Sequence, residues 1–126
     1  LDDQLKASDS DIEIIFMHIP ISYKKSDDKI IKTEPLSVYS QKSDYYNILN
    51  ILEKHSSTRL IFVGHNHDNI INNYTYSNGN TLTQVMTGCF GRDYESDNWR
   101  IIKIAKNSIK IYFPGSSSEI EYTILL

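Results

Sequence analysis

The sequence predicts an α/β fold in which one βαβ unit is followed by antiparallel hairpins. Two short apolar segments, residues 12–17 and 59–63, are separated by an amphipathic segment over residues 44–55. Residues 71–86 then change to the alternation of apolar and polar side chains that is typical of half-buried strands. Since a strand, a crossover helix and a second strand form a parallel pair, we expect the first two strands to share one sheet.

The chain begins with what resembles the end of a helix, because Leu1 and Leu5 are one helical turn apart. Residues 12–17 are rich in β-branched and aromatic side chains and predict a strand that is buried on most sides. We expect this strand to end at His18, since Pro20 has no amide hydrogen for further pairing.

Residues 21–42 are polar and have no clean period, so they predict a long loop that could act as a lid on the substrate side. A helix follows over residues 44–55, with Ser43 as its N-cap. Its apolar side chains have the i, i+3, i+4, i+7 spacing of one helix face: Tyr45, Ile48, Leu49 and Leu52. The second strand, residues 59–63, stops at Gly64.

Two hairpins are expected in the rest of the chain. Residues 71–76 and 81–86 flank an Asn78-Gly79 turn, which is the strongest short-range hairpin signal. Residues 100–105 and 109–113 predict a second hairpin that turns at residues 106–108.

Composition excludes several classes of protein. The 126 residues are enough for one domain, and 40% apolar with 23% charged residues is ordinary for a globular chain. The apolar runs are far shorter than the roughly 20 residues that span a bilayer. A net charge of −3, with no basic cluster beyond Lys24-Lys25, argues against nonspecific binding to nucleic acid or to an anionic membrane. The single cysteine, Cys89, cannot form an internal disulfide.

Three histidines form the candidate site. His65 and His67 follow a buried strand and Gly64, and residues two apart on an extended segment point the same way. His18 ends the other strand of the predicted parallel pair, so all three are expected at one sheet edge, where open α/β sheets bind ligands. Imidazole suits Zn, Fe, Mn or Cu. The alternatives are that His18 is a hydrogen-bonded rim residue, and that His65 and His67 cap a turn or are solvated.

Four segments carry a resemblance to the calcineurin-like metallophosphoesterases, and more narrowly to their purple-acid-phosphatase-like branch. They are HIPI at 18–21, LIFVGHNHDN at 60–69, TGCFGRD at 87–93 and NWRIIKI at 98–104. The similarity extends from residue 1 to about residue 113. It implies that the chain is the second half of a β-sandwich flanked by helices.

The resemblance also implies a function, which is metal-dependent phosphoester hydrolysis by a metal-bound hydroxide at a dinuclear site. His18 and His65 would bind the second metal and His67 the first, with Fe, Zn or Mn as the two ions. No other catalytic residue is expected in this chain. The cations would attract the phosphoester substrate in spite of the negative net charge, and they would stabilise the attacking and leaving oxygens.

The earlier motifs of that family, an Asp-x-His pair, a bridging Asp and an Asn-His, have no match in this sequence. We therefore expect residues 1–126 to be the C-terminal part of one domain whose N-terminal half is missing, and to be inactive without that half. Two alternatives stay open. The chain could be a non-catalytic module that binds at most one metal and acts in interactions, or a truncated half-domain whose exposed sheet edges cause association.

Overall fold

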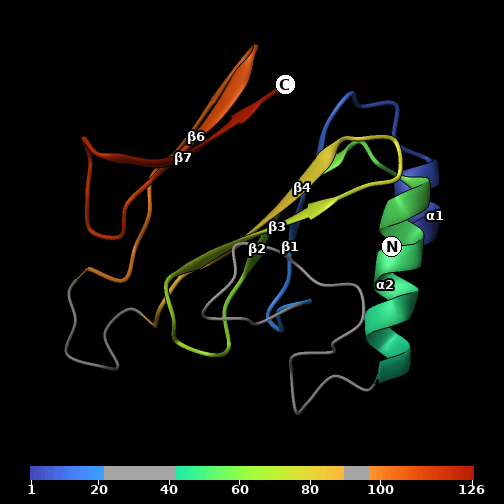
Figure 1. Cartoon of the computed structure of the whole chain (residues 1–126), viewed down its shortest axis with the longest axis horizontal. Coiled ribbons are helices and arrows are strands. Elements are labelled where there is room, and N and C mark those ends of the chain that lie inside the picture. Colours follow the sequence, from blue (N-terminus) through green and yellow to red (C-terminus); the bar gives the residue numbers. More distant parts are fainter. Residues whose placement is uncertain (22–41, 90–96) are drawn as a thin grey trace.

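The computed structural model describes residues 1–21, 42–89 and 97–126, so the loop predicted over residues 21–42 lies almost wholly outside the described residues. Two helices and seven strands are present in the described part (Figure 1). In chain order they are α1 (Asp2–Lys6), β1 (Glu13–Phe16), α2 (Lys42–Lys54), β2 (Thr58–Val63), β3 (Ile70–Thr75), β4 (Thr81–Met86), β5 (Ile102–Ala105), β6 (Ser108–Tyr112) and β7 (Ile120–Leu125).

The first sheet has four strands in the order β1-β2-β4-β3 and is mixed. β1 and β2 pair in parallel, with Ile14 opposite Leu60 and Phe16 opposite Phe62, which confirms the predicted parallel pair. β3 and β4 form the predicted antiparallel hairpin. In addition, β4 pairs in parallel with β2, so the hairpin extends the first sheet instead of standing apart from it.

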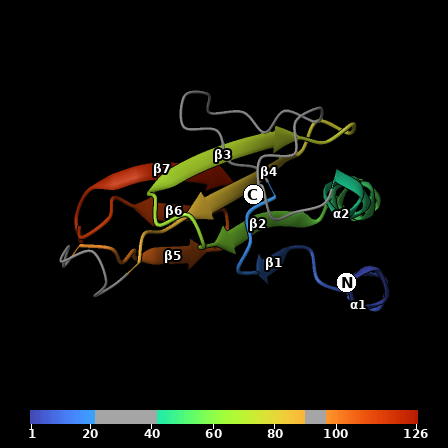
Figure 2. The same cartoon turned by 90° about the horizontal axis from the view of Figure 1, so that it is seen from below.

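The second sheet has three antiparallel strands in the order β5-β6-β7. β5 and β6 are the second predicted hairpin, with Ile102 opposite Ile111. β7 is not among the predicted elements, and it pairs with β6 along its length. Helix α2 and the second sheet lie on opposite sides of the first sheet (Figures 1 and 2).

The layers enclose two apolar cores. One core lies between α2 and the first sheet and consists of Leu5, Ile21, Leu49, Leu52, Ile61, Val63, Tyr74, Tyr76, Leu82 and Met86. The other lies between the two sheets and consists of Leu60, Val85, Ile109, Ile111 and Ile124. Successive residues of β2 therefore enter different cores, which is why its sequence is apolar without alternation.

Polar contacts tie the layers together. The Arg59 side chain on β2 donates from Nε to the Thr81 carbonyl (3.0 Å) and from Nη2 to the Leu125 carbonyl (3.2 Å), which links the two sheets. Just before β2 begins, His55 donates from Nε2 to the Asp2 carboxylate of α1 (2.9 Å). No helix in the described ranges is long and apolar enough to cross a membrane.

Candidate metal centre

The candidate centre lies where β1 and β2 end. The Met17 amide donates to the Phe62 carbonyl and the Gly64 amide donates to the His18 carbonyl, each at 3.0 Å. The parallel pairing therefore continues past both strands. It sets His18 directly beside Gly64 and the residue after it, as the βαβ topology predicts.

The structure brings His18 and His65 together. His65 Nδ1 lies 3.2 Å from His18 Nε2, and the two rings meet edge-on at 85° with their centroids 5.1 Å apart. A Cβ atom added at Gly64 would lie 3.8 Å from His18 Nδ1, which is ordinary van der Waals contact. Glycine at position 64 is thus not required by the space around the His18 ring.

The backbone after Gly64 is not extended. His65 and His67 both have left-handed backbone angles, with φ of 71° and 55°, and the Asn66 amide donates back to the Gly64 carbonyl at 2.9 Å. The expectation that residues two apart point the same way on an extended segment is therefore wrong as a reason for grouping His65 with His67. Histidine is among the residue types that adopt this conformation more often than most.

His67 stays a prediction as a ligand. Its side chain is exposed. Within residues 1–21, 42–89 and 97–126, no three or more His, Cys, Asp or Glu side chains are grouped so that they could hold a metal ion. The described part of the chain thus offers a pair of convergent imidazoles and no complete ligand set.

The His18–His65 pair fits two ligands of a single metal ion. Two nitrogens, each roughly 2.0–2.1 Å from a tetrahedral metal, lie about 3.3 Å apart. The observed separation of 3.2 Å matches that edge, and it also suits a hydrogen bond between one protonated and one unprotonated ring nitrogen. The same geometry therefore serves a metal site and a metal-free pair.

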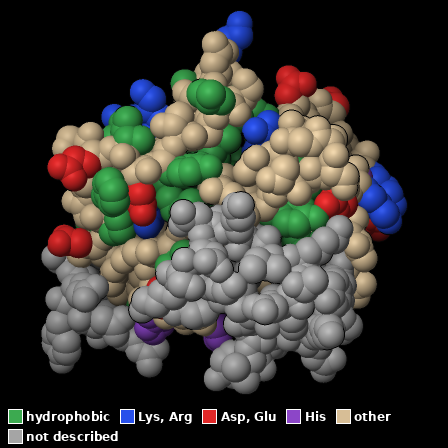
Figure 3. Space-filling model, in the orientation of Figure 1, with side chains coloured by type: hydrophobic (Ala, Val, Ile, Leu, Met, Phe, Trp, Pro, Cys, Tyr) green, Lys and Arg blue, Asp and Glu red, His purple; other side chains and the backbone are tan. Residues whose placement is uncertain are grey.

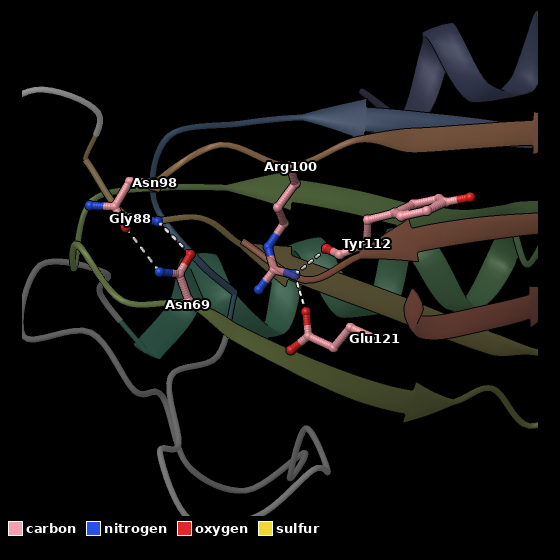
Figure 4. A network of polar contacts seen from close by, with 6 residues as sticks. All are labelled: Asn69, Gly88, Asn98, Arg100, Tyr112 and Glu121. Atoms are coloured by element: carbon pink, nitrogen blue, oxygen red, sulfur yellow. Dashed lines mark hydrogen bonds and ion pairs between the residues drawn. The ribbon is translucent and has the colours of Figure 1, made fainter. Parts of the chain in front are cut away.

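An asparagine network anchors the loop that carries His65 and His67 (Figure 4). Asn69 donates from Nδ2 to Asn98 Oδ1 (3.0 Å), and its own Oδ1 accepts from the Gly88 amide (3.1 Å). Asn98, which is buried, donates to the Cys89 carbonyl (3.1 Å). Neither asparagine was a candidate from the sequence, because isolated Asn residues in loops carry no distinctive signal.

The surface beside the pair is an open hollow lined by Phe16, Met17, His18, Phe62 and Val63. Histidine side chains reach the surface of the face seen in Figure 3. The hollow has apolar walls and one imidazole, so the ring of His18 is its main polar feature.

Comparison with known proteins adds no assignment. No family model matches this sequence, and a search of curated proteins finds no match either. The resemblance to metallophosphoesterases therefore rests on the four quoted segments alone.

Proposed function

We propose that this chain contributes histidine ligands to a metal-dependent phosphoester hydrolase of the acid-phosphatase type, with His18 and His65 on one metal ion. The observation that carries the proposal is the 3.2 Å separation of His18 Nε2 and His65 Nδ1 at the ends of two parallel strands. The layered arrangement of helix, mixed sheet and second sheet supports the further proposal that this is half of a metallophosphoesterase β-sandwich.

The role of each ring follows from which nitrogen faces its partner. A ligating nitrogen must be unprotonated, so His18 would carry its proton on Nδ1 and His65 would carry its proton on Nε2. The strand pairing sets His18 beside Gly64, and the asparagine network anchors the end of the loop that carries His65. When bound, the metal ions would supply Lewis acidity that activates water and neutralises phosphate oxygens.

Metal binding by the 126-residue chain tests the ligand assignment. Zn²⁺ and Mn²⁺ are titrated calorimetrically into the parent chain and into His18→Asn and His65→Asn variants. Asparagine is chosen because it tolerates the left-handed backbone at position 65. We expect each variant to bind metal at least tenfold more weakly. His55→Gln is the matched control, since His55 lies at the α1 contact with Asp2 and should not alter metal affinity.

Unchanged affinity in both variants would refute the ligand assignment. Hydrolysis is then measured with p-nitrophenyl phosphate on the natural protein that contains this chain, with and without the His65→Asn change. Loss of turnover in that variant is the expected result, and full turnover would overturn the proposal.

A second candidate is a non-catalytic module that holds at most one metal ion. It is favoured by the observation that two, and not three, imidazoles converge in the described part of the chain. Near-stoichiometric metal in the natural protein without any phosphoester hydrolysis would support this candidate over the first.

A further inference from the structure

Arg100 is a buried cation, and only one of its three guanidinium nitrogens makes hydrogen bonds in the described part of the chain. Its side chain is 2% exposed. Nη1 donates to the Tyr112 carbonyl at 2.9 Å and pairs with the Glu121 carboxylate, and Figure 4 shows both contacts leaving from this one nitrogen. Nε and Nη2 are also buried, and neither has a hydrogen-bond partner in the described part of the chain.

The two unpartnered nitrogens belong to one edge of the guanidinium group. Their N–H bonds point in nearly parallel directions, and this is the fork that donates to the two oxygens of a carboxylate. Buried polar groups are normally paired, so a buried arginine edge without a partner calls for an explanation. A bound oxyanion would satisfy it.

Arg100 lines a groove of about 390 Å³ between the ends of β1 and β2 and the edge strand β5. Its other walls are mainly apolar and include Phe16, Phe62, Ile102 and Ile104. Phe16 and Phe62 stack with their ring centroids 5.0 Å apart. Phe16 is 76% exposed and Ile104 is 64% exposed, so the rim of the groove presents apolar surface to water.

We infer that this groove binds a small monocarboxylate with an apolar tail. The carboxylate would lie on the Nε and Nη2 edge of Arg100, and the hydrocarbon tail would lie against Phe16, Phe62 and Ile104. The volume is within the range of small-molecule sites and has room for a medium-chain acid. Because both nitrogens are buried, the carboxylate can reach them only when the groups that cover them move aside.

The charge around Arg100 selects among anions. Glu121 already offsets part of the positive charge, so a phosphate dianion would meet a like charge close by. A planar monoanion with two oxygens matches the free edge and carries less repulsion. The apolar walls in turn favour a ligand whose other end is a hydrocarbon.

The test uses the 126-residue chain and three probes: octanoate, 1-octanol and acetate. Their binding is followed by calorimetry and by amide chemical shifts. We expect octanoate to bind at least tenfold more tightly than octanol, which lacks the carboxylate, and than acetate, which lacks the tail. Equal affinity of octanoate and octanol would overturn the inference, since it would leave Arg100 without a role.

Two pairs of variants locate the site. Arg100→Lys keeps the charge but removes the fork, and it should weaken octanoate binding at least tenfold, whereas Arg59→Lys should not change it. Ile104→Asp should weaken binding at least tenfold, while Leu125→Asp, at a similarly exposed strand position, should leave it unchanged. If Arg100→Lys does not fold, Ile104→Asp still decides, and unaltered octanoate binding in that variant would refute the site.

Discussion

The Nδ1 atom of His65 lies 3.2 Å from the Nε2 atom of His18, although the two residues are 47 positions apart in the sequence. The contact exists because β1 and β2 are parallel and end at the same edge of the sheet. The Gly64 amide then continues the pairing by donating to the His18 carbonyl. A local backbone feature accompanies this long-range contact, since His65 and His67 both have left-handed backbone angles.

The left-handed backbone at His67 predicts that glycine is tolerated better than valine at this position. His67→Gly should leave the free energy of unfolding within about 1 kcal/mol of the parent, because glycine adopts a φ of 55° without steric cost. His67→Val should be about 1–2 kcal/mol less stable than His67→Gly, since a β-branched residue is strained there. Urea denaturation measures both. Ser117, an exposed loop residue without a positive φ, supplies the control pair Ser117→Gly and Ser117→Val, whose difference should be small.

Two glycines with similar backbone angles should respond differently to alanine. Gly79 has a φ of 89° and open space where a Cβ would go, so Gly79→Ala should cost about 1 kcal/mol from backbone strain alone. Gly115 has a φ of 73°, and a Cβ there would lie 2.6 Å from Asp97 Cβ. Gly115→Ala should therefore be the more destabilising by about 1 kcal/mol or more, because overpacking adds to the strain. Thermal melts of the two variants decide, and equal losses would contradict the prediction.

Tyr76 should contribute through its hydroxyl. The buried side chain donates to the Thr58 carbonyl at 2.8 Å. Tyr76→Phe should lower the free energy of unfolding by about 1–2 kcal/mol, because the buried carbonyl loses its donor. Tyr122→Phe is the comparison, since Tyr122 is only partly buried and should cost less.

The same residue predicts a response to alkaline pH. Burial is the main cause that raises the pKa of Tyr76 well above its ordinary value of 10.0. A group with a raised pKa stabilises the fold fully below the pKa of the unfolded state and loses that contribution as the pH rises above it. Stability of the parent should therefore fall above about pH 10, and Tyr76→Phe should fall less steeply. If the free energy of unfolding falls equally steeply in the parent and in Tyr76→Phe from pH 9 to 11, the result would contradict this prediction.

The lowered pKa of Asp2 predicts how the stability of the fold changes at acid pH. Hydrogen bonds from Lys6 and then from His55 lower the pKa of the Asp2 carboxyl from 3.8 to about 2. A lowered pKa stabilises the fold above the unfolded-state value, and the contribution is lost as the pH falls through the folded-state value. Asp2→Asn should remove the part of the acid destabilisation that occurs between pH 3.8 and about 2. Asp9→Asn, at an exposed position, should keep it, and circular dichroism during acid titration compares the two.

Local patterns in the sequence predicted much of the fold. The spacing of Leu49 and Leu52 predicts α2, and the Asn78-Gly79 turn predicts the first hairpin, because each signal acts over a few residues. The parallel pairing of β2 with β4 could not be predicted, since it depends on long-range packing. β7 was missed although Ile120, Tyr122 and Ile124 alternate, because a two-residue period over six residues is a weak signal next to a serine-rich turn.

The site was predictable only in part. The proximity of His18 and His65 follows from the βαβ topology, so it can be predicted from the sequence. The left-handed backbone at His65 and His67 has no sequence signature comparable to glycine. The buried edge of Arg100 could not be foreseen either, because it depends on where Tyr112 and Glu121 lie in the second sheet.

The central position of β4 has a consequence for the order in which the molecule assembles. β4 uses both of its edges, one for its hairpin partner β3 and one for β2. The hairpin closes a short loop and can form early, whereas joining β1 to β2 must bring together segments from far apart in the chain. We expect β1 to dock last, so that the two imidazoles meet only in the final stage of folding. Pulse-labelled hydrogen exchange should then detect protection of the Leu82 and Val85 amides before protection of the Ile15 and Met17 amides.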